Sequence, residues 1–316
     1  MKHYFASAAW KVSAQHAARR QFRSIISQPW GLMLVASWHP FFSARQEVRK
    51  MNRQYHFLCV LLCLFSHSMA FAQVNNDLAA YREAGSKLMS LVAEAERAPE
   101  KKGLESEEID QLVALLSNEM RFLGTKPHSA KDLENLLELC DTANRTVMSL
   151  AMFALKGHVD PTASPQKIAS QVAELMNKNV ETFGRHLRYL QPFSIRCLAR
   201  QVPAMTDFVT SLPPALFTDV RRKGLEKFRA GLAHVFVDVV ASLGNPNCDE
   251  AYRLALLESL ADSAPSFIST LPVPVRFQIR SLISPSPGTS KPVFGIGLLK
   301  IYHALEDKTC SGLCSI

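Results

Sequence analysis

The sequence has no apolar run long enough to cross a membrane as a helix. A spanning helix needs about 20 apolar residues, whereas the longest uninterrupted stretch, Phe57–Phe65, is followed directly by Ser66, His67 and Ser68. The alternation of apolar and polar residues that marks a half-buried β-strand is missing from residues 73–192. We therefore expect no transmembrane segment in the mature chain and a fold built from helices.

The short motifs that mark common enzyme classes are also missing. There is no His-Glu-x-x-His, no Gly-x-Ser-x-Gly, no phosphate-binding loop and no dinucleotide-binding fingerprint. Ser164-Pro-Gln-Lys167 matches the Ser-x-x-Lys of penicillin-recognising enzymes, but their Lys-Thr-Gly and Ser-Asp-Asn elements are absent. Ser164 directly precedes Pro165, which favours a helix cap. We expect a non-catalytic protein with no cofactor and no metal.

The mature chain has almost no net charge, although the whole sequence has a formal charge of +8. Residues 1–72 hold nine Lys or Arg and one acid, so that 27 basic and 27 acidic residues remain from Gln73 onward. The basic excess therefore gives no argument for nucleic acid as a partner. Within the mature chain, residues 73–141 are acidic and the remainder is basic.

Met51–Ala72 has the parts of a secretory signal peptide. Arg53 supplies the positive start, Phe57–Phe65 the short apolar centre, and Ala70-Phe71-Ala72 the small-x-small cleavage site. Cleavage before Gln73 predicts a secreted or periplasmic protein. Residues 1–50 would hide this signal, so we interpret them as a non-native or disordered basic leader. Their basic, nearly acid-free composition also resembles a transit peptide.

Residues 73–283 are typical of a series of amphipathic helices with clear start and stop signals. Ser106, Ser129 and Ser164 are predicted N-caps. We expect helices over 77–97, 107–120, 130–156, 165–191, 194–201, 204–212, 215–243, 248–261, 265–271 and 275–283, with Asn76 and Asn247 as further caps. Residues 284–292 form a Pro/Ser linker, and residues 293–316 a C-terminal helix and a Cys-containing tail packed on the helical domain.

The expected fold is all-α, either a multi-helix bundle or an irregular array of antiparallel helical hairpins. A short α-solenoid is possible because Leu-Pro joins recur at Leu212-Pro213 and Leu271-Pro272. Gly224 and Gly231 lie on one face of the 215–243 helix. Since interior glycines cost about 1 kcal/mol each relative to alanine, they predict that another helix crosses closely there.

Five cysteines remain after cleavage: Cys140, Cys197, Cys248, Cys310 and Cys314. An oxidising compartment predicts two disulfides and one free thiol, without fixing which cysteines pair. We favour a tail tied down by Cys310 or Cys314, paired either with Cys248 or with each other. The Cys310-x-x-x-Cys314 spacing departs from that of thioredoxin-like sites, which favours a structural over a redox role.

His234 and Asp238 are the weak candidates for chemistry. They share a face of an apolar helix and could be metal ligands or a general base with its orienting carboxylate, although an internal hydrogen bond is the simpler interpretation. The densest basic cluster could bind an anionic partner, dock on another copy or be a solvated helix face. It consists of Arg221, Arg222, Lys223, Lys227 and Arg229.

The function we expect is binding of an unknown protein partner, or self-association, through a helical surface. One alternative is an exported hydrolase or metal-dependent enzyme that uses the His234/Asp238 face. Another is a membrane-surface or lipid-binding protein that uses Val293–Leu305 as an amphipathic anchor. That segment has only Lys300 as a basic residue, which is unfavourable for anionic lipid.

Overall fold

The computed structural model describes residues 71–97, 104–125, 127–160, 162–245, 248–283, 292–307 and 312–314. Within these ranges the chain forms helices and no β-strand, which confirms the all-α prediction. The leader, the signal peptide as far as Ala70, Asn247 and residues 284–291 of the linker lie outside the described residues. The chain divides into two compact units. Among described residues, Lys156–Glu174 belongs to one unit, and the rest belongs to the other.

The N-terminal helices of the larger unit are α4 (Phe71–Arg97), α5 (Glu107–Leu116), α6 (Glu119–Phe122) and α7 (Leu133–Ala151). Helix α4 packs against the other three. Ser106 caps α5 as predicted, accepting from the amide of Ile109 at 3.3 Å. Ser129 and Asp132 form the predicted capping box, which opens a short 3-10 turn (Ala130–Asp132) before α7.

Three predicted boundaries in this region are wrong. Helix α4 begins at Phe71 and not at residue 77, so Asn76 lies inside the helix and is not its cap. The 107–120 helix is broken at Ser117, because the Asn118 side chain accepts from the Arg121 amide and starts α6. The helix expected to reach residue 156 ends at Ala151, and Ala154 then takes a positive φ of 61°. A short helix, α8 (Leu155–His158), follows.

Helix α9 (Pro165–Ser211) is one continuous helix of 47 residues that contains Pro192 and Pro203. The sequence predicted three helices there, because each proline removes one hydrogen bond within a helix. The helix continues because packing holds the turns around Pro192: Pro192, Phe193 and Ile195 are all buried. The Ser259 hydroxyl of α11 (Glu250–Thr270) also donates to the Pro192 carbonyl at 2.9 Å.

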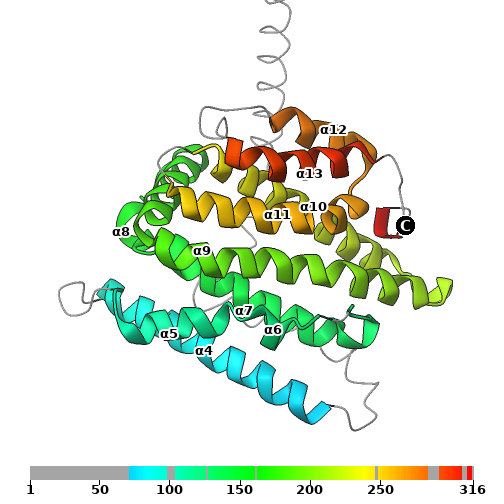
Figure 1. The fold of residues 1–316 in the computed structure, drawn as a ribbon, viewed down its shortest axis with the longest axis horizontal. Coiled ribbons are helices and arrows are strands. Elements are labelled where there is room, and N and C mark those ends of the chain that lie inside the picture. Colours follow the sequence, from blue (N-terminus) through cyan, green and yellow to red (C-terminus); the bar gives the residue numbers. More distant parts are fainter. Residues whose placement is uncertain are drawn as a thin grey trace, which may run out of the picture. The chain divides into compact units, whose positions relative to one another are not determined.

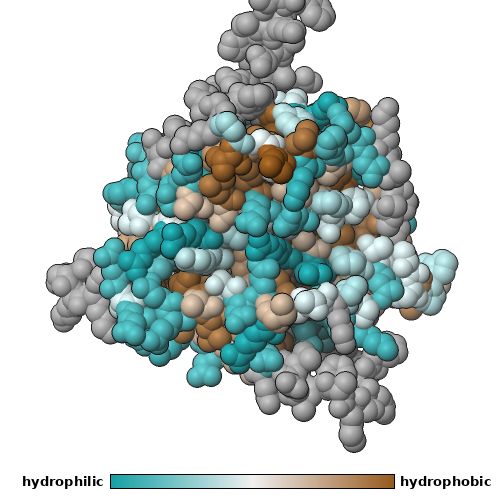
Figure 2. All heavy atoms as spheres, in the orientation of Figure 1, coloured by the Kyte–Doolittle hydropathy of each residue, from teal (hydrophilic) through white to brown (hydrophobic). Residues whose placement is uncertain are grey.

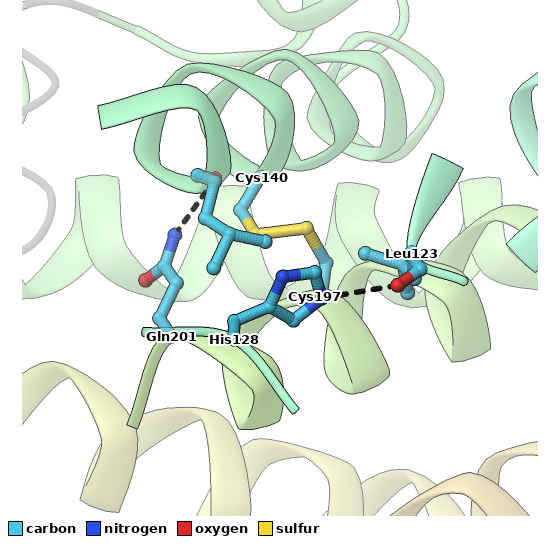
Figure 3. The surroundings of a disulfide bond; sticks show 6 residues. Leu123, His128, Cys140, Cys197 and Gln201 are labelled. Atoms are coloured by element: carbon cyan, nitrogen blue, oxygen red, sulfur yellow. Dashed lines mark hydrogen bonds between the residues drawn. A yellow bond between two sulfur atoms is a disulfide. The ribbon is translucent and has the colours of Figure 1, made fainter. Parts of the chain in front are cut away.

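The part of α9 that belongs to the larger unit lies between α7 and α11 (Figure 1). On the α7 side, a disulfide joins Cys140 to Cys197, and Gln201 Nε2 donates to the Leu136 carbonyl at 3.2 Å (Figure 3). On the α11 side, the Tyr252 hydroxyl donates to Gln191 Oε1 at 2.5 Å. Side-chain bonds therefore connect α9 to both α7 and α11.

The C-terminal helices are α10 (Asp219–Leu243), α11, α12 (Val273–Leu282) and α13 (Gly295–Glu306), with 3-10 turns at Pro214–Leu216, Pro292–Phe294 and Gly312–Cys314. Helix α11 packs against α10 and α13, and α12 packs against α13. The expected break between 261 and 265 is wrong, because α11 continues through Pro265. Its cap is Asp249, whose side chain accepts from the Ala251 amide at 3.3 Å.

The glycine prediction for α10 is also wrong. A Cβ atom added at Gly224 or Gly231 would meet nothing within 4 Å, so no helix of the described ranges crosses closely there. The close approach is at Gly297 of α13, where an added Cβ would lie 2.6 Å from Leu257 Cγ of α11. A second close approach is at Gly85 of α4, where an added Cβ would lie 2.7 Å from Thr142 Cγ2 of α7.

Candidate functional site

Helix α13 exposes apolar side chains because its orientation is fixed by the contacts of its opposite face. Gly297 abuts Leu257, and Phe294, Ile301 and Leu305 are buried. The outward face of α13 and of the 3-10 turn before it then carries three large apolar residues at helical spacing. They are Val293, Ile296 and Leu299, which are 52%, 75% and 56% exposed. We call these three residues the α13 strip.

The α13 strip belongs to a wider hydrophobic area. Figure 2 shows hydrophobic residues gathered in the upper part of the view, over the region where Figure 1 places α12 and α13. On α12, Phe277 is also about half exposed. Single exposed apolar residues are ordinary on soluble proteins, but apolar residues grouped on one face are typical of an interaction surface.

Two cations of α12 and α13 form ion pairs with acids of the same chain. Lys300 Nζ of α13 lies 3.5 Å from an Asp262 carboxylate oxygen of α11. Arg280 of α12 contacts Glu306 of α13 at 2.7 Å. Each of these two pairs joins one positive and one negative group within the described residues.

A hollow of about 470 Å³ lies between α11, α12 and α13. It is lined by apolar groups such as Ala261, Pro265 and Ile268 and by the side chain of Arg276, which is 1% exposed. Arg276 donates from Nε to the Leu271 carbonyl at 2.8 Å and from Nη1 to the Asp307 carbonyl at 2.5 Å. Its Nη2 lies 3.9 Å from Cys314 Sγ.

The cysteine candidates are separated by the fold. Cys140 and Cys197 form the α7–α9 disulfide, while Cys248 is a buried free thiol, so it is not the partner of the tail. Burial raises the pKa of the Cys248 thiol, which lowers its reactivity. Cys314 is disulfide-bonded, and Cys310 lies outside the described residues.

His234 and Asp238 both lie on α10. Desolvation raises the pKa of Asp238, and the nearby His234 opposes this shift. Because the Asp238 residue is exposed, water screens much of the effect. Among the described residues, no group of three or more His, Cys, Asp or Glu side chains could hold a metal ion. The pair therefore has no third ligand in that part of the chain.

The five basic candidates all lie on α10 but do not form a uniform surface. Arg222 approaches Asp219 at 4.0 Å and lies 5.9 Å from the centre of the Phe217 ring. Arg221 donates to the Leu216 carbonyl. Nε and Nη2 of Arg229 are buried without a hydrogen-bond partner, and desolvation lowers the pKa of this residue. Lys223 and Lys227 are exposed.

A polar cluster that the sequence did not indicate joins α5 to α9. The carboxylate of Asp110 accepts from Arg185 Nη2 at 2.8 Å and from His186 Nε2 at 3.2 Å. His186 is 2% exposed, and its Nδ1 is buried with no hydrogen-bond partner. Desolvation lowers the pKa of His186 most, and the Arg185 charge lowers it further. This cluster connects α5 to α9 through Asp110 and Arg185, which are 75 positions apart in the chain.

The helices within the described ranges are too short or too polar to cross a membrane. The chain matches no protein-family model, and comparison with curated proteins and with solved structures finds no similar chain.

Proposed function

We propose that the chain is an exported, non-catalytic interaction protein that pairs with a second copy of itself through the α13 strip. One observation carries the proposal: Val293, in the 3-10 turn before α13, and Ile296 and Leu299 of α13 are exposed together, while Gly297 and Ile301 fix the opposite face of the helix. Burying this apolar surface against a similar one removes it from water, which is the main driving force of protein association.

The ion pairs beside the α13 strip favour a second copy over an anionic partner. Nucleic acids and anionic lipids attract unpaired cations, whereas Lys300 and Arg280 are each paired with an acid of the same chain. Cations that are already paired within the chain add little repulsion between two copies related by a two-fold axis. A few apolar side chains fall short of a standard interface, so we expect weak dimerisation, with a Kd in the micromolar to millimolar range.

The Cys140–Cys197 pair supports export. Both cysteines are buried where α7 meets α9, and disulfides persist mainly in oxidising compartments. The intact mass of the natively expressed protein tests this part of the proposal. We expect the mass of Gln73–Ile316, increased by two hydrogens per disulfide on reduction. A product that retains residues 1–50 and has only free thiols would contradict export.

Sedimentation velocity over a range of concentrations tests self-association. The average mass of the exported protein should rise with concentration, and Ile296→Glu should remove the rise because a buried carboxylate opposes association. Val220→Glu is the matched control, since Val220 is 76% exposed on α10, outside the α13 strip.

Two outcomes would overturn the self-association proposal. One is a wild-type protein that stays monomeric at every concentration. The other is a dimer that both glutamate variants retain, which would place the interface elsewhere. Flotation with phosphatidylcholine vesicles distinguishes the lipid-binding alternative, because a monomer that floats through the α13 strip is a membrane-surface protein.

A further inference from the structure

A second hollow, of about 270 Å³, lies where α9 carries Pro192. Its walls come from the turn between α5 and α6, from α9 and from α11. Arg188, Pro192 and Arg196 are four residues apart on α9, so they lie on one face of that helix and line the hollow together. Pro192 has no N–H, so the carbonyl of Arg188 lacks its usual helical donor.

The two arginines of this hollow differ in their partners. Arg196 forms an ion pair with Glu119 at the start of α6. Arg188 has no carboxylate partner among the described residues, and its Nε is buried without a hydrogen bond. Its guanidinium lies 4.7 Å from the centre of the Tyr189 ring, which also lines the hollow. A guanidinium held by an aromatic ring, with donors unused, is well placed to accept a carboxylate.

An acid without a cation partner lines the same hollow. Glu258 of α11 makes no hydrogen bond or ion pair within the described part of the chain. Glu258 is an exposed residue, and no ion pair joins it to Arg188 within the described part of the chain. Each charge is therefore available to an opposite charge on a bound molecule.

We propose that this hollow binds a small zwitterion, a molecule that carries one carboxylate and one ammonium group. The carboxylate accepts hydrogen bonds from Arg188, and the ammonium donates to Glu258. The volume fits this class, since about 30 Å³ per water gives room for roughly nine waters, enough for an amino acid of ordinary size. A ligand with only one charge would leave either Arg188 or Glu258 without a partner.

Calorimetric titration of the exported protein tests the proposal. The zwitterionic probes are glycine, L-leucine, β-alanine and γ-aminobutyrate, which differ in the spacing of their charges or in their side chain. The single-charge probes are acetate and methylammonium. We expect at least one zwitterion to bind more tightly than both single-charge probes. Arg188→Gln and Glu258→Gln should each weaken that binding by about tenfold or more, because each removes a charge-assisted hydrogen bond.

Arg200→Gln and Glu181→Gln are the matched controls, because both residues lie on α9 but do not line the hollow. Unchanged thermal unfolding shows that the variants fold. No binding of any zwitterion at millimolar concentration would overturn the proposal, as would binding that both pocket variants retain. Acetate binding equal to that of the zwitterions and unaffected by Glu258→Gln would show a simple anion site and would also overturn it.

Discussion

The Nε of Arg276 donates a hydrogen bond to the carbonyl oxygen of Leu271, 2.8 Å away, in a position that is almost closed to water. Leu271 is the C-cap of α11, and Asp307, whose carbonyl Arg276 also contacts, is the C-cap of α13. Helix C-termini carry partial negative charge and unpaired carbonyls. The buried cation of α12 is therefore stabilised by the ends of two neighbouring helices.

Arg276→Met should destabilise the fold by about 3 kcal/mol, because it removes the donor of the buried Leu271 carbonyl and a second, part-buried hydrogen bond to the Asp307 carbonyl. Arg276→Lys should recover only part of this loss, since one ammonium lacks the fixed fork of a guanidinium. Urea denaturation measures both effects. Arg280→Met is the control, because Arg280 forms an exposed ion pair with Glu306, and such pairs contribute about 0–1 kcal/mol. Equal losses for Arg276→Met and Arg280→Met would contradict the special role of the buried arginine.

Two glycine substitutions should have opposite effects. Gly297→Ala places a Cβ about 2.6 Å from Leu257 Cγ, so α13 or Leu257 must move, at a cost of about 1–3 kcal/mol. Gly224→Ala in the interior of α10 meets open space and should stabilise the protein by about 0.5–1 kcal/mol. Thermal unfolding of the two variants compares the signs directly. A stabilising Gly297→Ala would show that α13 does not approach α11 closely.

The Cys140–Cys197 disulfide should contribute about 2–4 kcal/mol, as expected for a bond that closes a loop across a sequence separation of 57. Replacing both cysteines with alanine should lower the unfolding free energy by that amount and remove most of its sensitivity to reductant. Cys248→Ala is the control, because this thiol is free and buried. Its unfolding should respond to reductant as the wild type does. A wild-type protein whose stability ignores reductant would be inconsistent with the disulfide.

Stability should fall as the pH drops below about 6.5, because His186 is held neutral in the folded state. Desolvation and Arg185 lower its folded pKa below the ordinary value of 6.5, against the opposing effects of Asp110 and Glu105. Between the folded and unfolded pKa values the unfolded chain binds the extra proton, so acid favours unfolding. The lowered pKa of Asp110 adds its own loss only below about 3.8, outside this range.

Melting temperatures measured between about pH 7 and pH 5 test this assignment. His186→Gln should flatten the pH dependence, whatever its effect on absolute stability, because glutamine does not titrate. His303→Gln is the control, since His303 is exposed on α13. If the His186 variant keeps the wild-type slope, another group is responsible.

Local signals in the sequence predicted the helix class and several helix starts correctly. Ser106 and the pair Ser129–Asp132 form the caps that their spacing indicates, because capping depends on atoms within one turn. The same local reasoning failed at Pro192. The cost of a proline is local, whereas the contacts that offset it come from residues such as Ser259, 67 positions away.

The candidate sites also depend on contacts between residues that are distant in sequence. The segment 293–305 was identified as amphipathic, but its exposed face depends on the contact between Gly297 and Leu257, which no periodicity reveals. Gly224 and Gly231 looked equivalent to such a glycine in sequence and yet meet open space. Arg188 and Glu258 lie on different helices, so nothing in the linear pattern predicts that they line one hollow.

The disulfide between α7 and α9 also has a topological consequence. Cys140 and Cys197 close a covalent ring that includes residues 156–174, the described part of the smaller unit. A protease that cuts one peptide bond inside this ring does not release a fragment, because the sulfur bridge still connects the two pieces. Under oxidising conditions, a nick anywhere from residue 140 to residue 197 therefore leaves a single covalent molecule, in which the helices on both sides of α9 remain connected.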